Sequence, residues 1–362
     1  ASSRNSGYLV DSTMNDGFVS SKNTKDYKAK CDLYSLGIEK VKKFIAQHRV
    51  DCDWNECGKY YASSKIQDEK KLIRFNNMLT SLKINNQILY KDALLKKLGT
   101  EFYKVALYTN GGILLNPGKL ARAMVDSLPK NVTLYENSPL LEWKEINKKI
   151  NCTFSRGVIK ASSIIFCTNG FLSSLGIESQ YSFPLLLTAS MTRRLTDKEF
   201  SLIGSPSEWG VLSIRAMGAT IRMTKDHRIL IRNTVSLHNN NINIDNNRNI
   251  HLQGILKRFP SLPEDIIETT WSGTVCRSGN AAPIFKKINN NIYAAGCFNG
   301  SGIGLGTLFG EEIANKVSNN MTNEIYLIQK TKKPNWLPPQ PFLNLGIKAR
   351  FLIDKNHAKS EL

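Results

Sequence analysis

A glycine-dense segment near residue 300 constrains this sequence more than any other feature. Residues 293–307 spell Tyr-Ala-Ala-Gly-Cys-Phe-Asn-Gly-Ser-Gly-Ile-Gly-Leu-Gly-Thr, which predicts a strand and a tight turn, followed by a helix over Leu308–Val317. Glycine lacks a Cβ, so such a turn adopts positive φ and lets a ligand approach its backbone closely. The following helix points its partially positive N-terminus at whatever lies over the turn. The segment therefore indicates a site for an electron-rich ring or a phosphate, although a ligand-free connection has the same local pattern.

The chain is long enough for two globular parts, and its charge is strongly positive. It has 362 residues, with 49 Lys and Arg against 30 Asp and Glu, which gives a net charge of +19. Such an excess raises affinity for polyanions and anionic cofactors, but no block of like charge forms a binding tail. The seven cysteines include no Cys-x-x-Cys pair, so no metal site is expected, and reduced thiols in a cytoplasmic protein fit best. No apolar run approaches the roughly 18 residues of a membrane span.

Several further segments follow one another along the chain. They are residues 1–7 (Ala-Ser-Ser-Arg-Asn-Ser-Gly), Ile113–Leu120 with Asn-Pro inside it, Val132–Pro139 ending in Glu-Asn-Ser-Pro, Ile164–Gly170, the alternating Arg222–Leu230 hairpin, and Trp271-Ser272-Gly273 followed by Ala282-Pro283-Ile284. Together with the glycine-dense segment, they resemble the D-amino-acid-oxidase-like (DAO) superfamily of FAD-dependent oxidoreductases. The branch that they resemble most is the gamma-glutamylputrescine-oxidase-like one.

The resemblance implies a mixed α/β (α+β) fold with a Rossmann-like FAD/NAD(P)-binding domain and an inserted antiparallel β-sheet substrate domain. The expected boundaries are 1–50, 104–175 and 266–327 for the discontinuous FAD-binding domain, 51–103 and 176–265 for the substrate domain, and 328–362 for a C-terminal arm. Within these parts we expect a strand at Val132–Tyr135, a loop over the Asn-rich run His238–Asn247, and an extended, proline-containing arm. The family's Gly-x-Gly-x-x-Gly turn would precede residue 1. We therefore expect an N-terminally incomplete domain, and a fragment that binds flavin weakly or not at all.

The resemblance also implies the cofactor, the reaction and the residues of the site. The cofactor is FAD, and the enzyme oxidises the carbon–nitrogen bond of an amine or amino acid by hydride transfer to flavin, giving an imine that hydrolyses. No catalytic residue and no metal ligand is assigned. The residues expected to contact FAD are Ser2, Arg4, Asn5, Gly7, Thr168, Asn169, Gly170, Gly300, Ser301, Gly302 and Ile303. A substrate carboxylate would need a bidentate arginine, for which the candidates are Arg215, Arg222, Arg232 and Arg277.

Two other functions stay open at this point. One is a relative that acts on a modified wobble uridine in tRNA, which predicts a contiguous basic face and a linked methyltransferase domain; the sequence contains no such domain. The other is a non-catalytic basic remnant of the scaffold that binds a macromolecule. A small-molecule amine is the expected partner, and a nucleic acid is not. The sequence does not determine the amine, the electron acceptor, whether the flavin is covalently bound, or the oligomeric state.

Overall fold

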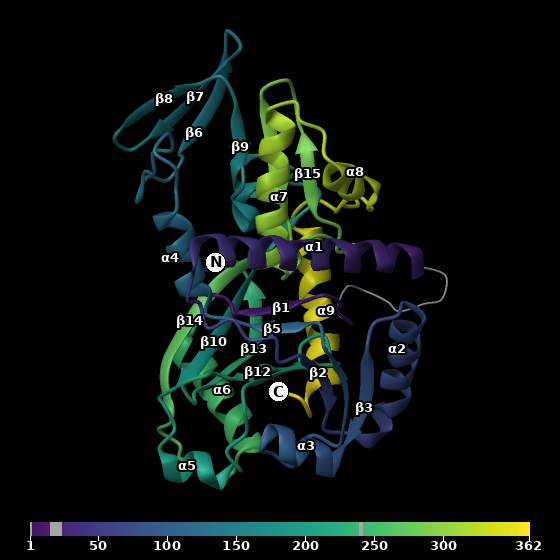
Figure 1. The fold of residues 1–362 in the computed structure, drawn as a ribbon. Coiled ribbons are helices and arrows are strands. Elements are labelled where there is room, and N and C mark those ends of the chain that lie inside the picture. The colour runs from purple at the N-terminus through teal and green to yellow at the C-terminus, as the bar shows by residue number, and fades with distance from the viewer. Residues whose placement is uncertain (1, 15–23, 239–241) are drawn as a thin grey trace.

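A computed structural model describes residues 2–14, 24–238 and 242–362 of the chain. Figure 1 shows a large sheet in the lower part and a smaller group of strands and helices above it, with the long helix α1 (Thr24–His48) crossing between them. Residue 1 and residues 15–23 lie outside the described residues, as do residues 239–241 of the predicted Asn-rich loop.

The large sheet has eight strands in the order β14-β10-β13-β12-β11-β2-β4-β3. Neighbouring strands are antiparallel, except that β11 and β2 are parallel. The strands are β14 (Ile267–Arg277), β10 (Phe183–Thr192), β13 (Ile229–Leu237), β12 (Thr220–Met223), β11 (Trp209–Ser213), β2 (Lys59–Ser63), β4 (Val105–Thr109) and β3 (Asn86–Tyr90). The pairing thus joins β4 and β14, from segments predicted to belong to the FAD-binding domain, to strands from the predicted substrate domain.

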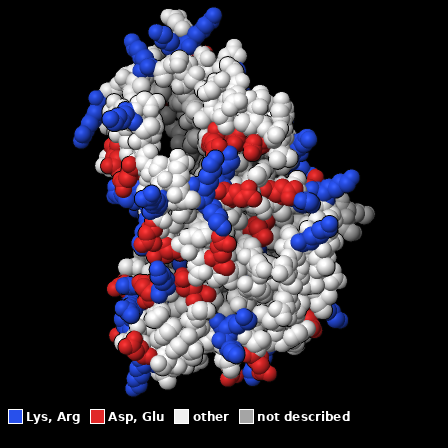
Figure 2. Space-filling view, viewed as in Figure 1, with Lys and Arg blue, Asp and Glu red and all other residues white. Residues whose placement is uncertain are grey.

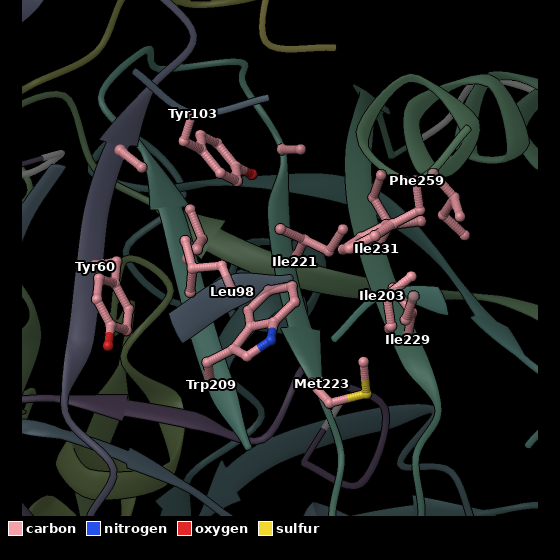
Figure 3. Packing of buried hydrophobic residues seen from close by; sticks show 14 of the residues in the cluster. Tyr60, Leu98, Tyr103, Ile203, Trp209, Ile221, Met223, Ile229, Ile231 and Phe259 are labelled. Carbon is pink, nitrogen blue, oxygen red and sulfur yellow. The ribbon is translucent and has the colours of Figure 1, made fainter. Parts of the chain in front are cut away.

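One face of this sheet is closed by a hydrophobic core. Helix α6 (Ile244–Arg258) packs on β13, β10 and β14, and the shorter helices α2 (Glu69–Ser81), α3 (Lys91–Leu98) and α5 (Asp197–Leu202) surround the sheet. Figure 3 shows Trp209, Ile221, Ile231 and Phe259 packed together in this core. Burying each such side chain contributes roughly 1.5–3 kcal/mol. Side chains that alternate with these along the strands point to the opposite face of the sheet.

The smaller sheet carries the glycine-dense turn. Its order is β15-β16-β9, and β16 is antiparallel to β15 but parallel to β9. Its strands are β15 (Ile284–Lys287), β16 (Ile292–Gly296) and β9 (Ile164–Phe166). The turn leads from β16 into α7 (Gly302–Val317), as the sequence predicts, but the helix begins six residues earlier than expected. The mixed α/β fold is confirmed.

The remaining elements connect these two sheets. A three-stranded meander consists of β6 (Glu142–Ile146), β7 (Lys149–Phe154) and β8 (Gly157–Ala161). β1 (Tyr8–Val10) pairs with β5 (Gly112–Leu114), and α4 (Pro117–Asp126) follows, with Asn116 as its N-cap residue. Two further helices close the chain, α8 (Asn323–Lys330) and α9 (Phe342–Ala358).

The predicted strand at Val132–Tyr135 is wrong. This segment has no strand pairing, and Val132, Leu134 and Tyr135 are 46%, 50% and 64% exposed. Strand β9, the outer strand of the small sheet, has no partner on its second edge among the described residues. A strand needs a neighbour for its N–H and C=O groups, and none lies beside Val132–Tyr135.

Two other local predictions are also corrected. The Asn-rich run is helical from Ile244, because the Asn243 side chain accepts a hydrogen bond from the Asn246 N–H (2.9 Å) and so caps α6. The C-terminal arm is not extended throughout. Its prolines end at Pro341, and the proline-free residues 342–358 form α9.

Helices α1 and α7 approach each other closely enough for backbone contact. A Cβ built on Gly37 would lie 2.6 Å from the carbonyl carbon of Gly304. Lys40 then joins the two helices, because its Nζ lies 2.5 Å from Glu311 Oε1 and 3.5 Å from Glu312 Oε1. This crossing fixes the first turn of α7, and with it the end of the glycine-dense turn.

A buried histidine beneath the large sheet gives a pH prediction. His251 on α6 is fully buried, with Nδ1 2.7 Å from Ser190 Oγ and Nε2 3.0 Å from Thr234 Oγ1. Burial, assisted by the positive charge of Arg232, lowers the pKa of His251 to about 4. The unfolded chain, with a pKa of about 6.5, therefore binds the proton more readily. The resulting stability is full above pH 6.5 and is lost as the pH falls towards 4.

Replacing His251 with glutamine should remove this part of the pH dependence. Between pH 6.5 and pH 4 the free energy of unfolding should fall by roughly 3 kcal/mol more in the wild type than in His251→Gln. Urea unfolding of both proteins at several pH values measures the difference. Parallel curves for the two proteins would show that His251 does not stay neutral in the folded state.

Candidate functional site

A cavity of about 1450 Å³ lies over the face of the large sheet that α6 leaves uncovered. Ligand pockets for small molecules usually span about 300–1,000 Å³, so this one has room for a dinucleotide and a second small molecule. Its lining includes the sheet face, the glycine-dense turn with the start of α7, residues 2–10 and one side of α9, together with residues of α1, α4 and the segment after β14. Segments from both ends of the sequence therefore meet in one site.

The glycine-dense turn opens onto this cavity. Cys297, Asn299 and Gly300 have φ angles of 55°, 54° and 103°, and a Cβ at Gly300 would meet no atom within 4 Å. The predicted residues Gly300, Ser301, Gly302 and Ile303 all line the cavity. The Ser301 side chain makes no capping hydrogen bond, so the first N–H groups of α7 keep their capacity to bind a partner. This backbone surface suits a flat, electron-rich ring.

The loop before β1 lies across β14. The Trp271 indole Nε1 donates a hydrogen bond to the Arg4 carbonyl oxygen (3.0 Å), and Asn5 Oδ1 accepts one from the Gly7 N–H (2.8 Å). The predicted residues Ser2, Arg4 and Asn5 line the cavity, and so do residues 300–303. Gly7 does not line it.

Gly7 has a structural role in this loop. It has a φ of +64° and is enclosed, since a Cβ there would lie 2.1 Å from the Leu115 carbonyl oxygen. Both the positive φ and the lack of space for a Cβ require glycine at this position.

The segment after β9 reaches the cavity at Cys167 and Asn169. Asn169 lines it, and Asn169 Oδ1 accepts a hydrogen bond from the Phe298 N–H (3.4 Å), which ties this segment to the glycine-dense turn. Gly170 packs against the Thr274 side chain, and Thr168 is exposed; neither lines the cavity. Of the three residues predicted in this segment, only Asn169 lies in the cavity lining with the other residues predicted to contact FAD.

The four candidate arginines have different partners. Arg215 forms an ion pair with Asp68, and Arg222 donates to the carbonyl oxygens of Ser6 (2.8 Å), Gly7 (3.0 Å) and Leu115 (2.9 Å). The Arg222 guanidinium therefore holds the N-terminal loop in place. Neither Arg222 nor Arg215 lines the cavity.

Arg232 and Arg277 line the cavity instead. Arg277 Nη1 donates to the Asn299 carbonyl oxygen (3.1 Å), and so joins β14 to the glycine-dense turn.

Arg232 lies on the cavity face of β13. Its Nη2 donates to Thr220 Oγ1 (2.6 Å) on the neighbouring strand, and among the described residues it forms no ion pair with a carboxylate. Burial, together with the nearby charge of Arg277, lowers the pKa of Arg232 to about 10, so the guanidinium stays charged at neutral pH. A desolvated cation without an anion is a binding site for one.

Helix α9 contributes to the site but was not among the predicted site residues. Leu343, Ile347, Phe351 and Asp354 line the cavity at helical spacing. The signal was present in the sequence as apolar residues three and four apart, but the prolines just before it favoured an extended arm.

The charged surface does not form one basic face in the view of Figure 2. Lys and Arg side chains there alternate with Asp and Glu over much of the molecule. The net charge of +19 is thus spread among charges of both signs on this face. In the described part of the chain, no helix combines the length and the apolar composition needed to cross a lipid bilayer.

The residues present fit a flavin dinucleotide. The open backbone at Gly300 and Gly302 can lie against a ring, the cavity is large enough, and the lining carries Arg4, Arg232 and Arg277 without ion-paired carboxylates among the described residues. An electropositive, partly apolar cavity suits an anionic cofactor and an anionic substrate.

Comparisons with known proteins agree with this geometry. Residues 1–316 match the DAO family, described as FAD dependent oxidoreductase. The chain is 26% identical over 327 residues to the gamma-glutamylputrescine oxidoreductase of Escherichia coli, covering 87% of this chain and 74% of that protein. It is 23% identical over 312 residues to the probable oxidoreductase OrdL of Haemophilus influenzae, covering 79% of this chain and 67% of that protein.

Solved structures share the fold. Glycine oxidase from Geobacillus kaustophilus superposes with a TM-score of 0.73 at 18% identity, covering 89% of this chain and 86% of that one. Iminodiacetate oxidase from Chelativorans sp. gives a TM-score of 0.68 at 14% identity, covering 89% and 87%. The expectation that this chain is a fragment with weak flavin binding is tested by none of these comparisons and stays a prediction.

Proposed function

The chain belongs to the family of FAD-dependent oxidoreductases, and from that premise we propose that it oxidises the carbon–nitrogen bond of an amino acid or another amine that carries a carboxylate. The relatives support this reaction, since two solved neighbours are described as a glycine oxidase and an iminodiacetate oxidase. When bound, FAD accepts the hydride from the carbon next to nitrogen, and the imine then hydrolyses.

The observation that carries the proposal is the position of Arg232. It is a desolvated cation on the cavity floor, and its recorded hydrogen-bond partner is the Thr220 hydroxyl. A carboxylate would accept two parallel N–H bonds from the guanidinium and would neutralise its charge. Arg232 therefore binds and orients the carboxylate of the substrate.

The apolar surface around Arg232 sets the state of the amine. Leu187 and Val235 lie opposite each other on β10 and β13 and line the cavity, and Leu212 lies opposite Thr220. These side chains exclude water from the site. A low-polarity site disfavours the ammonium ion, so it lowers the pKa of the bound amine and favours the neutral form, which can release a hydride.

The cofactor is held by the lining segments that the resemblance identified. The backbone of Gly300, Ser301, Gly302 and Ile303 would hold the flavin together with Ser2, Arg4, Asn5 and Asn169, all of which line the cavity. Gly7 positions the N-terminal loop from below, because its carbonyl oxygen accepts from Arg222. Arg277 on β14 fixes the position of the glycine-dense turn relative to the large sheet, because its Nη1 donates to the Asn299 carbonyl oxygen.

Anaerobic reduction of the FAD-loaded protein tests the proposal. Glycine, leucine, N-methylglycine and the carboxylate-free amine 3-methylbutylamine are mixed with the protein, and the loss of oxidised-flavin absorbance is followed with detection of the carbonyl product. Carboxylated amines should reduce the flavin at least about 100-fold faster than 3-methylbutylamine. If carboxylated amines and 3-methylbutylamine reduced the flavin at equal rates, Arg232 would not bind the substrate carboxylate. If none of the amines reduced the flavin, the proposed reaction would be wrong.

A further inference from the structure

Helix α9 forms a wall of the cavity and lies outside the segment that matches the family. The family match ends at residue 316, whereas α9 spans Phe342–Ala358. Leu343, Ile347, Phe351 and Asp354 are spaced four, four and three residues apart, so they lie on one side of the helix, and all four line the cavity. Leu352, the next residue after Phe351, points away and is 73% exposed.

The far end of this helix is held against the large sheet. Glu361 is fully buried, and its Oε1 accepts hydrogen bonds from the Ser64 N–H (2.7 Å) and the Ser64 hydroxyl (2.7 Å). Its carbonyl oxygen accepts from the Ala219 N–H (3.1 Å) and from Arg258 Nη2 (2.8 Å). These bonds fix the C-terminal end of α9 beside the hairpin that joins β11 to β12. The same hairpin carries Met217, which lines the cavity.

The α9 wall of the cavity is mainly apolar, and the carboxylates that line the cavity are already paired. Among the described lining residues, each carboxylate has a cation: Asp354 pairs with Arg350, Glu311 with Lys40 and Asp26 with Lys332. A second positive charge on the substrate would have to displace one of these cations. On the α9 side, a second negative charge would meet the apolar side chains of Leu343, Ile347 and Phe351, whereas Arg277 lies on the sheet side of the cavity.

We propose that α9 determines specificity, and that the substrate is an amino acid with a bulky apolar side chain. This inference rests on the proposed function, because it takes Arg232 as the carboxylate site. The carboxylate binds Arg232, and the side chain lies against Leu187 and Val235 on the sheet and against Ile347 and Phe351 on α9. Burial of apolar surface on both sides provides the affinity, at roughly 25 cal/mol per Å².

Binding of unreactive acids to the FAD-loaded protein tests this without relying on turnover. Calorimetric titration uses 4-methylpentanoate, 5-aminopentanoate and pentanedioate, which share a carboxylate and differ in the tail. The wild type should bind 4-methylpentanoate at least about tenfold more tightly than the other two acids. Phe351→Ala should weaken 4-methylpentanoate binding about tenfold and change pentanedioate binding less than about twofold. Leu352→Ala, on the outer side of the same helix, should change neither.

The outcomes separate the two proposals. If the wild type binds all three acids equally tightly, or if Phe351→Ala weakens all three alike, α9 does not select the side chain, while the carboxylate site stands. If the wild type binds none of the three acids, the carboxylate site at Arg232 is wrong, and both proposals fail. Rates of flavin reduction with leucine, lysine and glutamate provide a second measurement, in which leucine should give the highest kcat/KM.

Discussion

Replacing Arg232 with methionine is expected to lower kcat/KM for a carboxylated amine by roughly 10²–10³-fold. The change removes the desolvated guanidinium that lines the cavity and leaves the carboxylate of the substrate without its partner. An amine without a carboxylate should lose less than about threefold, since it never used the arginine. Steady-state kinetics with leucine and 3-methylbutylamine measure both effects.

The same variant should be at least as stable as the wild type. Burial lowers the pKa of Arg232 to about 10, which means that the folded protein disfavours the charged form. Methionine has a similar length and no charge, so the free energy of unfolding at pH 7 should rise by about 1–3 kcal/mol. Loss of activity in a more stable protein cannot be ascribed to misfolding.

Two controls accompany the Arg232 variant. Arg232→Lys keeps the charge but not the fork of donors, so it should retain part of the activity. Arg156→Met removes an exposed arginine in the turn between β7 and β8 and should change nothing. The role of Arg232 would be disproved if leucine and 3-methylbutylamine lost activity in equal proportion.

Replacing Gly37 with leucine is expected to lower the free energy of unfolding by roughly 3 kcal/mol or more and to weaken FAD binding relative to the unsubstituted chain. A Cβ at this position would lie 2.6 Å from the Gly304 carbonyl carbon and 2.7 Å from its oxygen. Backbone atoms cannot move aside as a flexible side chain does. Helix α1 would therefore push the first turn of α7, which includes Gly302 and Ile303, out of place. Urea unfolding and FAD titration measure the two losses.

A second glycine in the same helix pair provides the control. Gly310 is in α7, and a Cβ there would meet no atom within 4 Å. Gly310→Ala should therefore be neutral or stabilise the protein by up to about 1 kcal/mol, since alanine is the better helix former. If Gly37→Leu were as stable as Gly310→Ala, the close crossing of α1 and α7 would not limit the position of the turn.

The glycine-dense turn could be predicted because its signal is local. A strand, a run of glycines and a helix follow one another within residues 293–317. The close approach of a ligand to this backbone depends on glycine, which lacks a Cβ and can be read directly from the sequence. The strand predicted at Val132–Tyr135 was wrong for the opposite reason. Its residues have high β-propensity, but a strand exists only where a neighbour pairs with it, and pairing is not a local property.

The sequence could not select among the four arginines. Arg222 and Arg232 lie on adjacent strands and face the same side of the sheet, so alternation cannot separate them. They differ in their hydrogen-bond partners. Arg222 donates to the carbonyl oxygens of Ser6 and Gly7, which are more than 200 residues away in the sequence. Helix α9 was missed because the prolines just before it favoured an extended arm, whereas the last of them, Pro341, directly precedes the helix.

The unpaired side of β9 has a consequence for how the protein behaves at high concentration. Within the described residues no strand pairs with this edge, and Ile165 on β9 is 39% exposed, so we expect that a second copy of the chain can add there edge to edge. The net charge of +19 opposes such association by mutual repulsion. Added salt shortens the range of that repulsion, to about 8 Å at physiological ionic strength. We therefore expect the protein to stay better dispersed in dilute buffer than at high salt.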